Sequence, residues 1–200
     1  MSTNEYRTLI PLFDELRSER ITVRPYRESD AEALQEAVDE SREYIRPWLP
    51  FADAHQTVEE SRDWIIQQEA LWLLREDMIV GVWENATGRF LGGSGMHIHD
   101  WRSRNFEIGY WLRPSAAGHG YMTEAVQLLT DYAFDHLEAN RVQIRCDERN
   151  IRSAAIPRRL GFVLEGILRD DRLATDGQLS GTMIFSMIRR DRKGDGLIHR

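Results

Sequence analysis

The stretch RPSAAGHGYMTEA, residues 113–125, separates two segments of opposite character. Residues 105–112 before it alternate in polarity like a β-strand, and residues 121–137 after it repeat apolar side chains at helical spacing. Between them, a proline, two glycines and a run of small residues break both patterns. A turn without bulk lets several backbone N–H groups converge, and the first turn of a helix adds about half a positive charge. This arrangement predicts a binding site for phosphate or pyrophosphate.

The spacing of the glycines excludes two common types of phosphate-binding turn. The turn lacks the Gly-Lys-Ser/Thr of a P-loop, and it does not follow the first strand of a βαβ unit as a dinucleotide fingerprint does. Arg113 and His119 flank the turn and would add positive charge. A tight turn that needs glycine only for its geometry is the alternative interpretation.

Composition and charge exclude several classes of protein. The 200 residues suit one domain, which we expect over residues 19–190, with an extension at 1–18 and a flexible tail at 191–200. A formal net charge of -7 argues against nucleic-acid binding and favours a cationic or amine partner. No apolar run is long enough to cross a membrane, and the start of the chain lacks the blocks of a secretion signal. Because Cys146 is the single cysteine, no internal disulfide can form, and we expect a cytoplasmic protein.

The order of the expected elements indicates a mixed sheet. We expect strands at residues 19–25, 78–84, 90–99, 105–112, 141–147, 162–168 and 182–188. We expect helices after the capping-box patterns at Ser29 and Thr57, after the glycine turn, and before the helix stop at Gly161. The fold class is therefore α/β (α+β): a single domain with a mixed central sheet of about six to seven strands, an antiparallel N-terminal meander and helices on both faces.

Four segments of the chain together resemble the GNAT N-acetyltransferases, and in particular their RimJ/RimL branch. Residues 106–125 resemble the acetyl-CoA-binding motif of the family. Residues 19–30 resemble the opening strand and helix start of the branch, and Trp48-Leu-Pro50 resembles its Trp-Leu-Pro loop. Residues 150–162 resemble the second cofactor motif. The resemblance covers about residues 19–190 and implies a single GNAT-like domain.

The resemblance implies acetyl-CoA as co-substrate, no metal, and direct transfer of the acetyl group to a primary amine. The branch suggests a protein N-terminal α-amine, of the ribosomal-protein type, as the acceptor. The alternatives are an N-acetyltransferase of small amines or antibiotics, and a CoA-binding regulatory module without activity. The sequence leaves the oligomeric state open, a homodimer included.

Matching the family motifs to this sequence assigns the cofactor contacts. They are Leu112, Arg113, Ala117, Gly118, His119, Gly120, Tyr121, Met122, Thr123, Asn150, Ser153 and Arg159. The chain departs from the family at Ser115 and Ala117, where Gln or Arg is usual, and at Pro157, where many members carry a tyrosine acid. We expect the first departures to weaken anchoring only modestly, because backbone N–H groups form the cradle. The acid role must pass from position 157 to another residue or to solvent.

Glu107 and Ser153 are the candidate catalytic residues. Glu107 lies between two apolar residues in the strand before the turn, and it matches the strand Glu that acts as base in several members of the family. It would accept the proton of the amine directly or through water. Ser153 would donate to the CoA sulfur, and Asn150 would bind the pantetheine amide. The structural alternatives are pairing of Glu107 with Arg102 or Arg104, and helix capping by Asn150 and Ser153.

For the remaining histidine, cysteine and aromatic side chains we expect structural or pocket-lining roles. His97 and His99 share a strand face but lack a third ligand at metal-binding spacing, so we expect them to line the pocket or to form a structural pair. Cys146 has no evident base partner and is expected to be a packed thiol. Aromatic residues expected to help enclose the acceptor are Trp48, Phe51 and Trp101.

Overall fold

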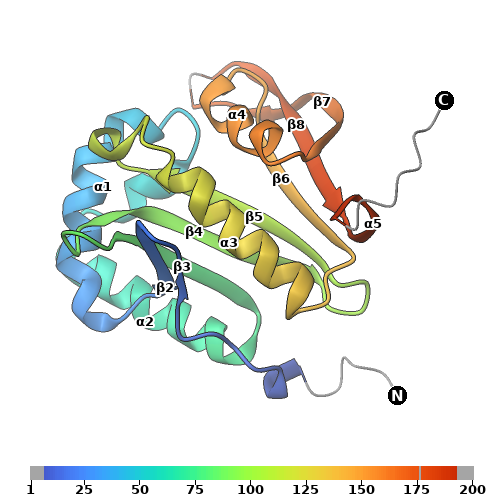
Figure 1. The fold of residues 1–200 in the computed structure, drawn as a ribbon. Coiled ribbons are helices and arrows are strands. Elements are labelled where there is room, and N and C mark those ends of the chain that lie inside the picture. Colours follow the sequence, from blue (N-terminus) through green and yellow to red (C-terminus); the bar gives the residue numbers. More distant parts are fainter. Residues whose placement is uncertain (1–6, 176, 193–200) are drawn as a thin grey trace.

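The computed structural model describes residues 7–175 and 177–192, which form a mixed sheet flanked by helices (Figure 1). The strands are β1 (Leu16–Arg17), β2 (Ile21–Pro25), β3 (Asp77–Glu84), β4 (Phe90–Asp100), β5 (Asn105–Leu112), β6 (Arg141–Asp147), β7 (Val163–Leu173) and β8 (Leu179–Ile188). Their order across the sheet is β1-β2-β3-β4-β5-β6-β8-β7. The β5–β6 pair is parallel and the others are antiparallel, so the predicted antiparallel meander leads into a mixed sheet.

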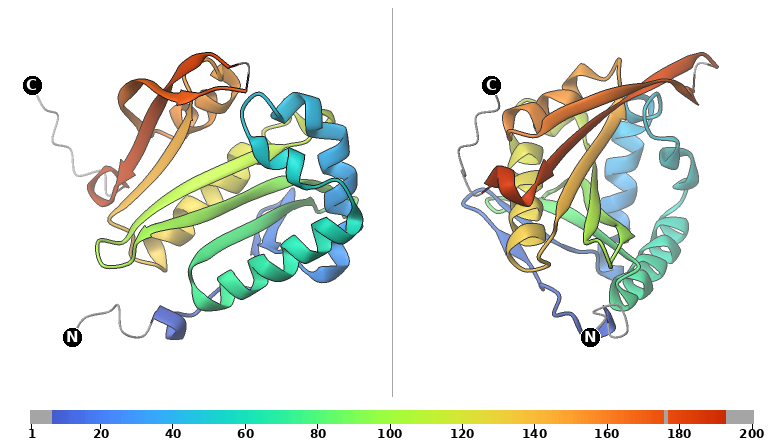
Figure 2. Two further views of the ribbon diagram at one scale, coloured as in Figure 1. Left: turned by 180° about the vertical axis from the view of Figure 1, so that it is seen from behind. Right: turned by 90° about the vertical axis from the view of Figure 1, so that its right-hand side faces the viewer.

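Helices cover both faces of the sheet, as predicted (Figures 1 and 2). One face carries α1 (Ala31–Ile45) and α2 (Val58–Leu74), and the other carries α3 (Tyr121–Asp135) and α4 (Ile151–Arg159). The short helices are η1 (Arg7–Leu9), η2 (Glu28–Asp30), η3 (Pro50–Ala54), η4 (Pro114–Ala116) and α5 (Arg189–Arg192). Two separate apolar cores result, one between α3 and the sheet and one beneath α1 and α2. None of the helices in the described part of the chain is both long and apolar enough to cross a bilayer.

The starts of α1 and α2 differ in how they are capped. The capping box at Thr57 is confirmed: its hydroxyl accepts the N–H of Glu60 at 3.1 Å, and the Glu60 carboxylate accepts the N–H of Thr57 at 3.2 Å. The capping box expected at Ser29 is wrong, because η2 precedes α1 there. The carboxylate of Asp30 instead accepts the N–H of Arg27 at 2.8 Å and the guanidinium of Arg24 at 2.7 Å. A local turn has therefore replaced the expected cap.

The sheet is larger than the sequence pattern indicated. Residues 16–17, which we assigned to an N-terminal extension, pair with β2 and add an eighth strand. Upstream of them, Phe13 packs edge-on against Trp72 at 5.1 Å and against Tyr132 at 4.7 Å, joining α2 to α3. The hairpin β7–β8 is also longer than the strands expected at residues 162–168 and 182–188. Pairing continues as far as Leu173 and Leu179, through polar positions such as Arg172 and Ser180. Of the expected flexible tail, residues 193–200 lie outside the described residues.

The parallel pair β5–β6 separates along its length, and this separation positions the site. The two strands pair only through Asn105–Arg141, Phe106–Val142 and Glu107–Gln143. Beyond Glu107, β5 continues alongside β4 while β6 continues alongside β8, and the ribbons diverge (Figure 1). The backbone of β5 after Glu107 therefore faces an opening in the sheet instead of a neighbouring strand.

Candidate active site

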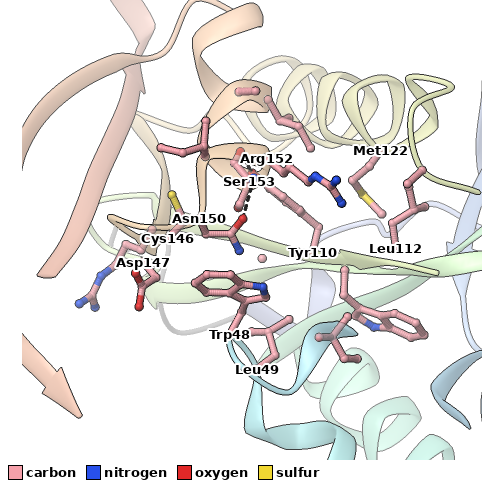
Figure 3. A pocket seen from close by; sticks show the side chains of 18 of the residues that line it. Trp48, Leu49, Tyr110, Leu112, Met122, Cys146, Asp147, Asn150, Arg152 and Ser153 are labelled. Atoms are coloured by element: carbon pink, nitrogen blue, oxygen red, sulfur yellow. Dashed lines mark hydrogen bonds between the residues drawn. The ribbon is translucent and has the colours of Figure 1, made fainter. Parts of the chain in front are cut away.

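A cavity of about 1140 Å³ lies where β5 and β6 diverge (Figure 3). Its walls come from the end of β5, the glycine turn, the start of α3, the end of β6, α4 and the segment after α1. Among the residues predicted from the sequence, those that line it are Glu107, Leu112, Ala117, Gly118, Gly120, Met122, Thr123, Asn150, Ser153 and Arg159. Segments as far apart in the chain as the glycine turn and α4 thus meet around one opening.

The glycine turn has the backbone geometry of an anion cradle. Gly118 and Gly120 have φ angles of 84° and 82°, in the left-handed region where side chains are strained. A Cβ placed on Gly118 would meet no atom within 4 Å, so the turn opens into space at that point. Gly120 is the residue that precedes α3, whose first N–H groups have no partner within the helix. On the opposite wall, Arg159 donates to the Thr123 hydroxyl at 3.1 Å and sets a positive charge beside these N–H groups. The residues present therefore suit a pyrophosphate.

Arg113 points away from this cradle. Its side chain is 3% exposed, and it donates to Glu36 at 2.7 Å, to Glu40 and to the carbonyl oxygen of Phe90. Glu40 also accepts the N–H of Ser115 at 3.0 Å. The expected contact between the Arg113 side chain and the cofactor is therefore not what the structure shows. Glu36 and Glu40 both belong to α1, so their ion pairs with Arg113 tie the turn to that helix. These two carboxylates also neutralise the charge of Arg113.

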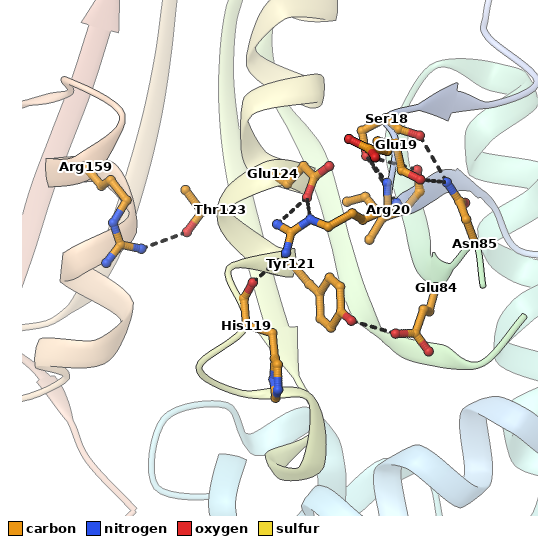
Figure 4. Close-up of polar contacts among 11 residues, drawn as sticks. Ser18, Glu19, Arg20, Glu84, Asn85, His119, Tyr121, Thr123, Glu124 and Arg159 are labelled. Atoms are coloured by element: carbon orange, nitrogen blue, oxygen red, sulfur yellow. Dashed lines mark hydrogen bonds and ion pairs between the residues drawn. The ribbon is translucent and has the colours of Figure 1, made fainter. Parts of the chain in front are cut away.

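The side chains of His119 and Tyr121 also lie outside the cavity, in a cluster built on Arg20 (Figure 4). The hydroxyl of Tyr121 donates to Glu84 at 2.6 Å, and the His119 ring stacks on Tyr121 with 5.7 Å between centroids. Arg20 donates to the carbonyl oxygen of His119 at 2.9 Å and to the carboxylate of Glu124 at 2.6 Å and 2.9 Å. Arg20 thus holds the glycine turn against the first turn of α3, a role for which the sequence offered no signal.

Two hydroxyl groups, one from the start of α4 and one from β5, lie side by side at the cavity. The amide oxygen of Asn150 caps the helix by accepting the N–H of Ser153 at 3.0 Å. The hydroxyl of Ser153 donates to the Tyr110 oxygen at 3.3 Å, and the Tyr110 hydroxyl donates to the carbonyl oxygen of Ser153 at 2.9 Å. Burial raises the pKa of Tyr110 above its ordinary value, so this phenol stays protonated at neutral pH.

Tyr110 is the residue that our sequence reasoning missed. Many GNAT enzymes carry a tyrosine on the short helix, where this chain has Pro157, and Pro157 is buried within α4. Tyr110 comes from β5, yet its hydroxyl reaches the same short helix. Its position in a strand, two residues before Leu112, was the only available signal. Nearby Cys146 is buried, as expected for a packed thiol, and burial raises its pKa.

Glu107 projects from the face of β5 opposite to Tyr110. Its carboxylate lies 2.9 Å from His99 Nε2 and accepts an N–H of Gln143 at 2.8 Å. The expected alternative partner Arg104 instead donates to the carbonyl oxygen of Leu137 at 2.6 Å. Glu107 is half-buried and lines the cavity, which makes it accessible to a ligand there. A carboxylate held by one imidazole and one amide can accept a further proton or hydrogen bond.

The two histidines of β4 have different partners. His97 contacts Asp77, with Nδ1 3.0 Å from the nearer carboxylate oxygen, and this hydrogen bond raises its pKa. His99 contacts Glu107, so His97 and His99 form separate pairs. Within residues 7–175 and 177–192, no group of three His, Cys, Asp or Glu side chains could hold a metal ion.

Only one of the three aromatic residues expected to enclose the acceptor lines the cavity. Trp48 does so from the segment after α1 (Figure 3). Phe51 packs against Trp111 at 5.6 Å, in the core beneath α1 and α2. Trp101 is buried edge-on against Phe106 at 5.2 Å and donates to a carbonyl oxygen. Phe51 and Trp101 therefore do not line the cavity: Phe51 is partly buried against the second core, and Trp101 is buried in the first.

Known proteins with similar sequences identify the family of this chain. The family model described as acetyltransferase (GNAT) domain matches residues 20–163. The chain is 32% identical over 180 residues to a Bacillus subtilis (strain 168) protein named "Putative ribosomal N-acetyltransferase YdaF", covering 89% of this chain and 96% of that protein. The match therefore spans nearly the whole of both proteins.

Solved structures agree with this fold. A crystal structure titled "Probable acetyltransferase" superimposes with a TM-score of 0.82 at 30% identity, covering 88% of this chain and 98% of that one. A second structure is that of RimL, the ribosomal L7/L12 α-N-protein acetyltransferase, in complex with coenzyme A. It superimposes with a TM-score of 0.79 at 24% identity, and the match covers 90% of this chain and 97% of that one. With the cradle and the divergent strands, these matches confirm the resemblance found in the sequence. The chain belongs to the GNAT acetyltransferase family and is an acetyl-CoA-dependent N-acetyltransferase.

Proposed function

We propose that this enzyme acetylates the N-terminal α-amine of a protein. The observation that carries the proposal is that Glu107 lines the same cavity as the glycine turn, with its side chain on the face of β5 opposite to the one where Tyr110 contacts α4. The cavity, of about 1140 Å³, exceeds the roughly 300–1,000 Å³ of small-ligand pockets, which leaves room for an extended chain beside CoA. The relative named as a ribosomal N-acetyltransferase supports the same class of acceptor.

In this proposal the cofactor binds on the α3 and α4 side of the opening. The N–H groups around Gly118 and Gly120 would hold the pyrophosphate, with Arg159 beside it. The backbone of β5 beyond Glu107 would bind the pantetheine arm, because β6 no longer pairs with it there. The amide of Asn150 points toward the cavity and would bind the same arm (Figure 3). These groups would place the thioester next to Ser153.

Glu107 would act as the general base. A protonated amine cannot attack a thioester, so a proton must leave the amine before or during transfer. Glu107 comes from the strand that leads into the cofactor turn, and its carboxylate is held in place by His99 and Gln143. It would take the proton directly or through one water molecule.

Ser153 would donate a hydrogen bond to the sulfur as the acetyl group leaves it. The Ser153 hydroxyl, which donates to the Tyr110 oxygen, would turn its proton to the sulfur. Tyr110 would hold Ser153 in place meanwhile through its own hydrogen bond to the Ser153 carbonyl oxygen. Burial keeps Tyr110 protonated at neutral pH, so its hydroxyl would donate to a ligand if it turned away from the Ser153 carbonyl oxygen. The pair would therefore supply the donor that Pro157 cannot.

A panel of acceptors tests the proposed function. Thiol release from acetyl-CoA is measured with N-terminal peptides, the same peptides blocked at the α-amine, and small amines, while calorimetry measures cofactor binding. Activity on free peptides and none on blocked ones is expected. Activity confined to small amines would overturn the acceptor class. Cofactor binding without turnover on any amine would favour a regulatory module.

A further inference from the structure

Two arginines, Arg145 of β6 and Arg172 of β7, line the cavity. The proposed reaction gives neither of them a role. Glu107 and Gln143 are level with each other in the parallel register of β5 and β6. Arg145 lies two residues further along β6, on the same face as Gln143, which is about 7 Å along a strand. Arg172, near the end of β7, lines the same cavity from across it. Both arginines therefore line the same cavity as the carboxylate proposed to deprotonate the amine.

These arginines are only partly neutralised. The Arg145 side chain is 39% exposed and lies 3.5 Å from Asp171, its nearest carboxylate. The Arg172 side chain is 29% exposed, 3.9 Å from Asp147 and 3.4 Å from the carbonyl oxygen of Trp48. Structural arginines of this chain bind more closely: Arg24 lies 2.7 Å from its carboxylate, where charge-assisted bonds normally fall. Arg145 and Arg172 thus retain donors that face the cavity.

The carboxylates near these arginines are already engaged. The side chain of Asp147 has no exposed surface, and it accepts the N–H of Arg149 at 2.8 Å and its Nε at 3.1 Å. Burial acts to raise the pKa of Asp147, but the hydrogen bonds from Arg149 outweigh it, so the pKa lies below its ordinary value. Glu43, at the rim, is highly exposed to solvent. Guanidinium groups nevertheless outnumber carboxylates along the cavity, although the whole chain carries a net charge of -7. The arginines that line it are Arg145, Arg149, Arg152, Arg159 and Arg172, and the carboxylates are Glu43, Glu107 and Asp147.

We propose that the acceptor carries a carboxylate a few bonds away from its amine, and that Arg145 and Arg172 bind this carboxylate. The inference rests on the proposed function, because it uses Glu107 to place the amine. A planar guanidinium matches the two oxygens of a carboxylate, whereas a neutral acceptor leaves it unpaired. In the proposed protein acceptor, the carboxylate belongs to an acidic residue at the first or second position. Turnover confined to small acidic amines would keep this carboxylate site but overturn the protein acceptor. The shared chemistry is an acidic primary amine.

Paired acceptors test this inference on the full chain. Matched peptides differ only by Asp or Asn at position one or two. A second arm uses single Asp and Asn residues as α-amides, because the α-carboxylate of a free amino acid would itself satisfy the proposed site. We expect kcat/KM to be at least about 10-fold higher for the acid of each productive pair, and the difference to shrink as salt is added. In Arg145→Gln and Arg172→Gln, KM for the acidic acceptor should rise while KM for its amide stays within about 2-fold. Arg145→Lys should restore part of the preference, since it keeps the charge.

Arg62→Gln is the matched control, because Arg62 is an exposed arginine of α2 that lies 3.8 Å from Glu28 and does not line the cavity. It should leave the preference unchanged. Equal kcat/KM for the acids and their amides in the native enzyme, or a preference that survives both Gln variants, overturns the inference while leaving the proposed function intact. Failure of every amine while acetyl-CoA still binds overturns the proposed function itself, and the inference with it.

Discussion

The hydroxyl of Tyr110 on β5 lies 3.3 Å from the hydroxyl of Ser153 on α4, and it donates to the Ser153 carbonyl oxygen at 2.9 Å. This pair joins one edge of the opening in the sheet to the helix beyond it. Because Pro157 removes the side chain that many relatives place on the short helix, the pair supplies the hydroxyl groups at this point of the cavity. Its energetic coupling can be measured.

Tyr110→Phe and Ser153→Ala should each lower kcat by about 10-fold or more, since each removes one member of a hydrogen-bonded pair. Their effects should not add: the double variant should be only slightly worse than the worse single variant. The measurement is a double-mutant cycle on kcat, with acetyl-CoA affinity followed by calorimetry. Effects on kcat that multiply fully would show that the two hydroxyl groups act independently.

Arg20 should act as a positioning residue for the cofactor turn. Its guanidinium joins the His119 carbonyl oxygen to the Glu124 carboxylate, as Figure 4 shows. In Arg20→Ala the turn loses both contacts, so KM for acetyl-CoA should rise by about 5-fold or more while kcat changes little. Arg17→Ala is the control, because Arg17 is exposed and pairs locally with Glu15. The account of the turn would be wrong if both variants had the same affinity for the cofactor.

Glu40 should make stability depend on pH in the acidic range. Burial opposes its ionisation, but hydrogen bonds from Arg113 and Ser115 outweigh burial and lower its pKa from 4.5 to about 2. Because the folded pKa is depressed, the stabilisation is fully present above pH 4.5 and is lost as the pH falls toward 2. Glu40→Gln should therefore lower the free energy of unfolding by on the order of 2 kcal/mol at pH 7, after allowance for partial exposure.

Urea unfolding of the native enzyme and Glu40→Gln at several pH values checks this expectation. The difference between the two proteins should narrow as the pH approaches 2. If the difference in the free energy of unfolding stayed constant from pH 7 to pH 3, the charge of the Glu40 carboxylate would contribute nothing to stability. The effect of the substitution would then come from packing or neutral hydrogen bonds.

Cys146 should have no covalent role. Its thiol is buried, and burial raises its pKa, so little thiolate exists at neutral pH. Cys146→Ala should keep kcat within about 3-fold, with thiol release measured on the same acceptor. A loss of about 100-fold or more, or an acetylated cysteine trapped by mass spectrometry, would point to a covalent intermediate.

The elements around the cofactor turn could be predicted from the sequence because proline and glycine mark their ends. The bounds of β5 and β6 agree with the expected strands, and Gly118 and Gly120 have the left-handed conformation that glycine allows. Such signals are local, so they place the backbone of a site reliably.

The direction of long polar side chains could not be predicted in the same way. Arg113 turns toward Glu36 and Glu40, which lie 77 and 73 residues away in the chain. The partner of Arg20 in α3 is 104 residues away. These contacts depend on how α1 and β2 pack on the sheet, and periodicity within one segment carries no information about that. Tyr110 was overlooked for the same reason, because its partner Ser153 belongs to α4.

The most direct test of the central claim compares Glu107→Gln with the native enzyme on one productive acceptor. Gln keeps the shape and the hydrogen-bond acceptor near His99 but cannot take a proton. We predict that kcat/KM for the acceptor falls by about 100-fold or more, while the Kd of acetyl-CoA measured by calorimetry is unchanged. Native turnover by Glu107→Gln, with the cofactor bound normally, would contradict the assignment of Glu107 as the base.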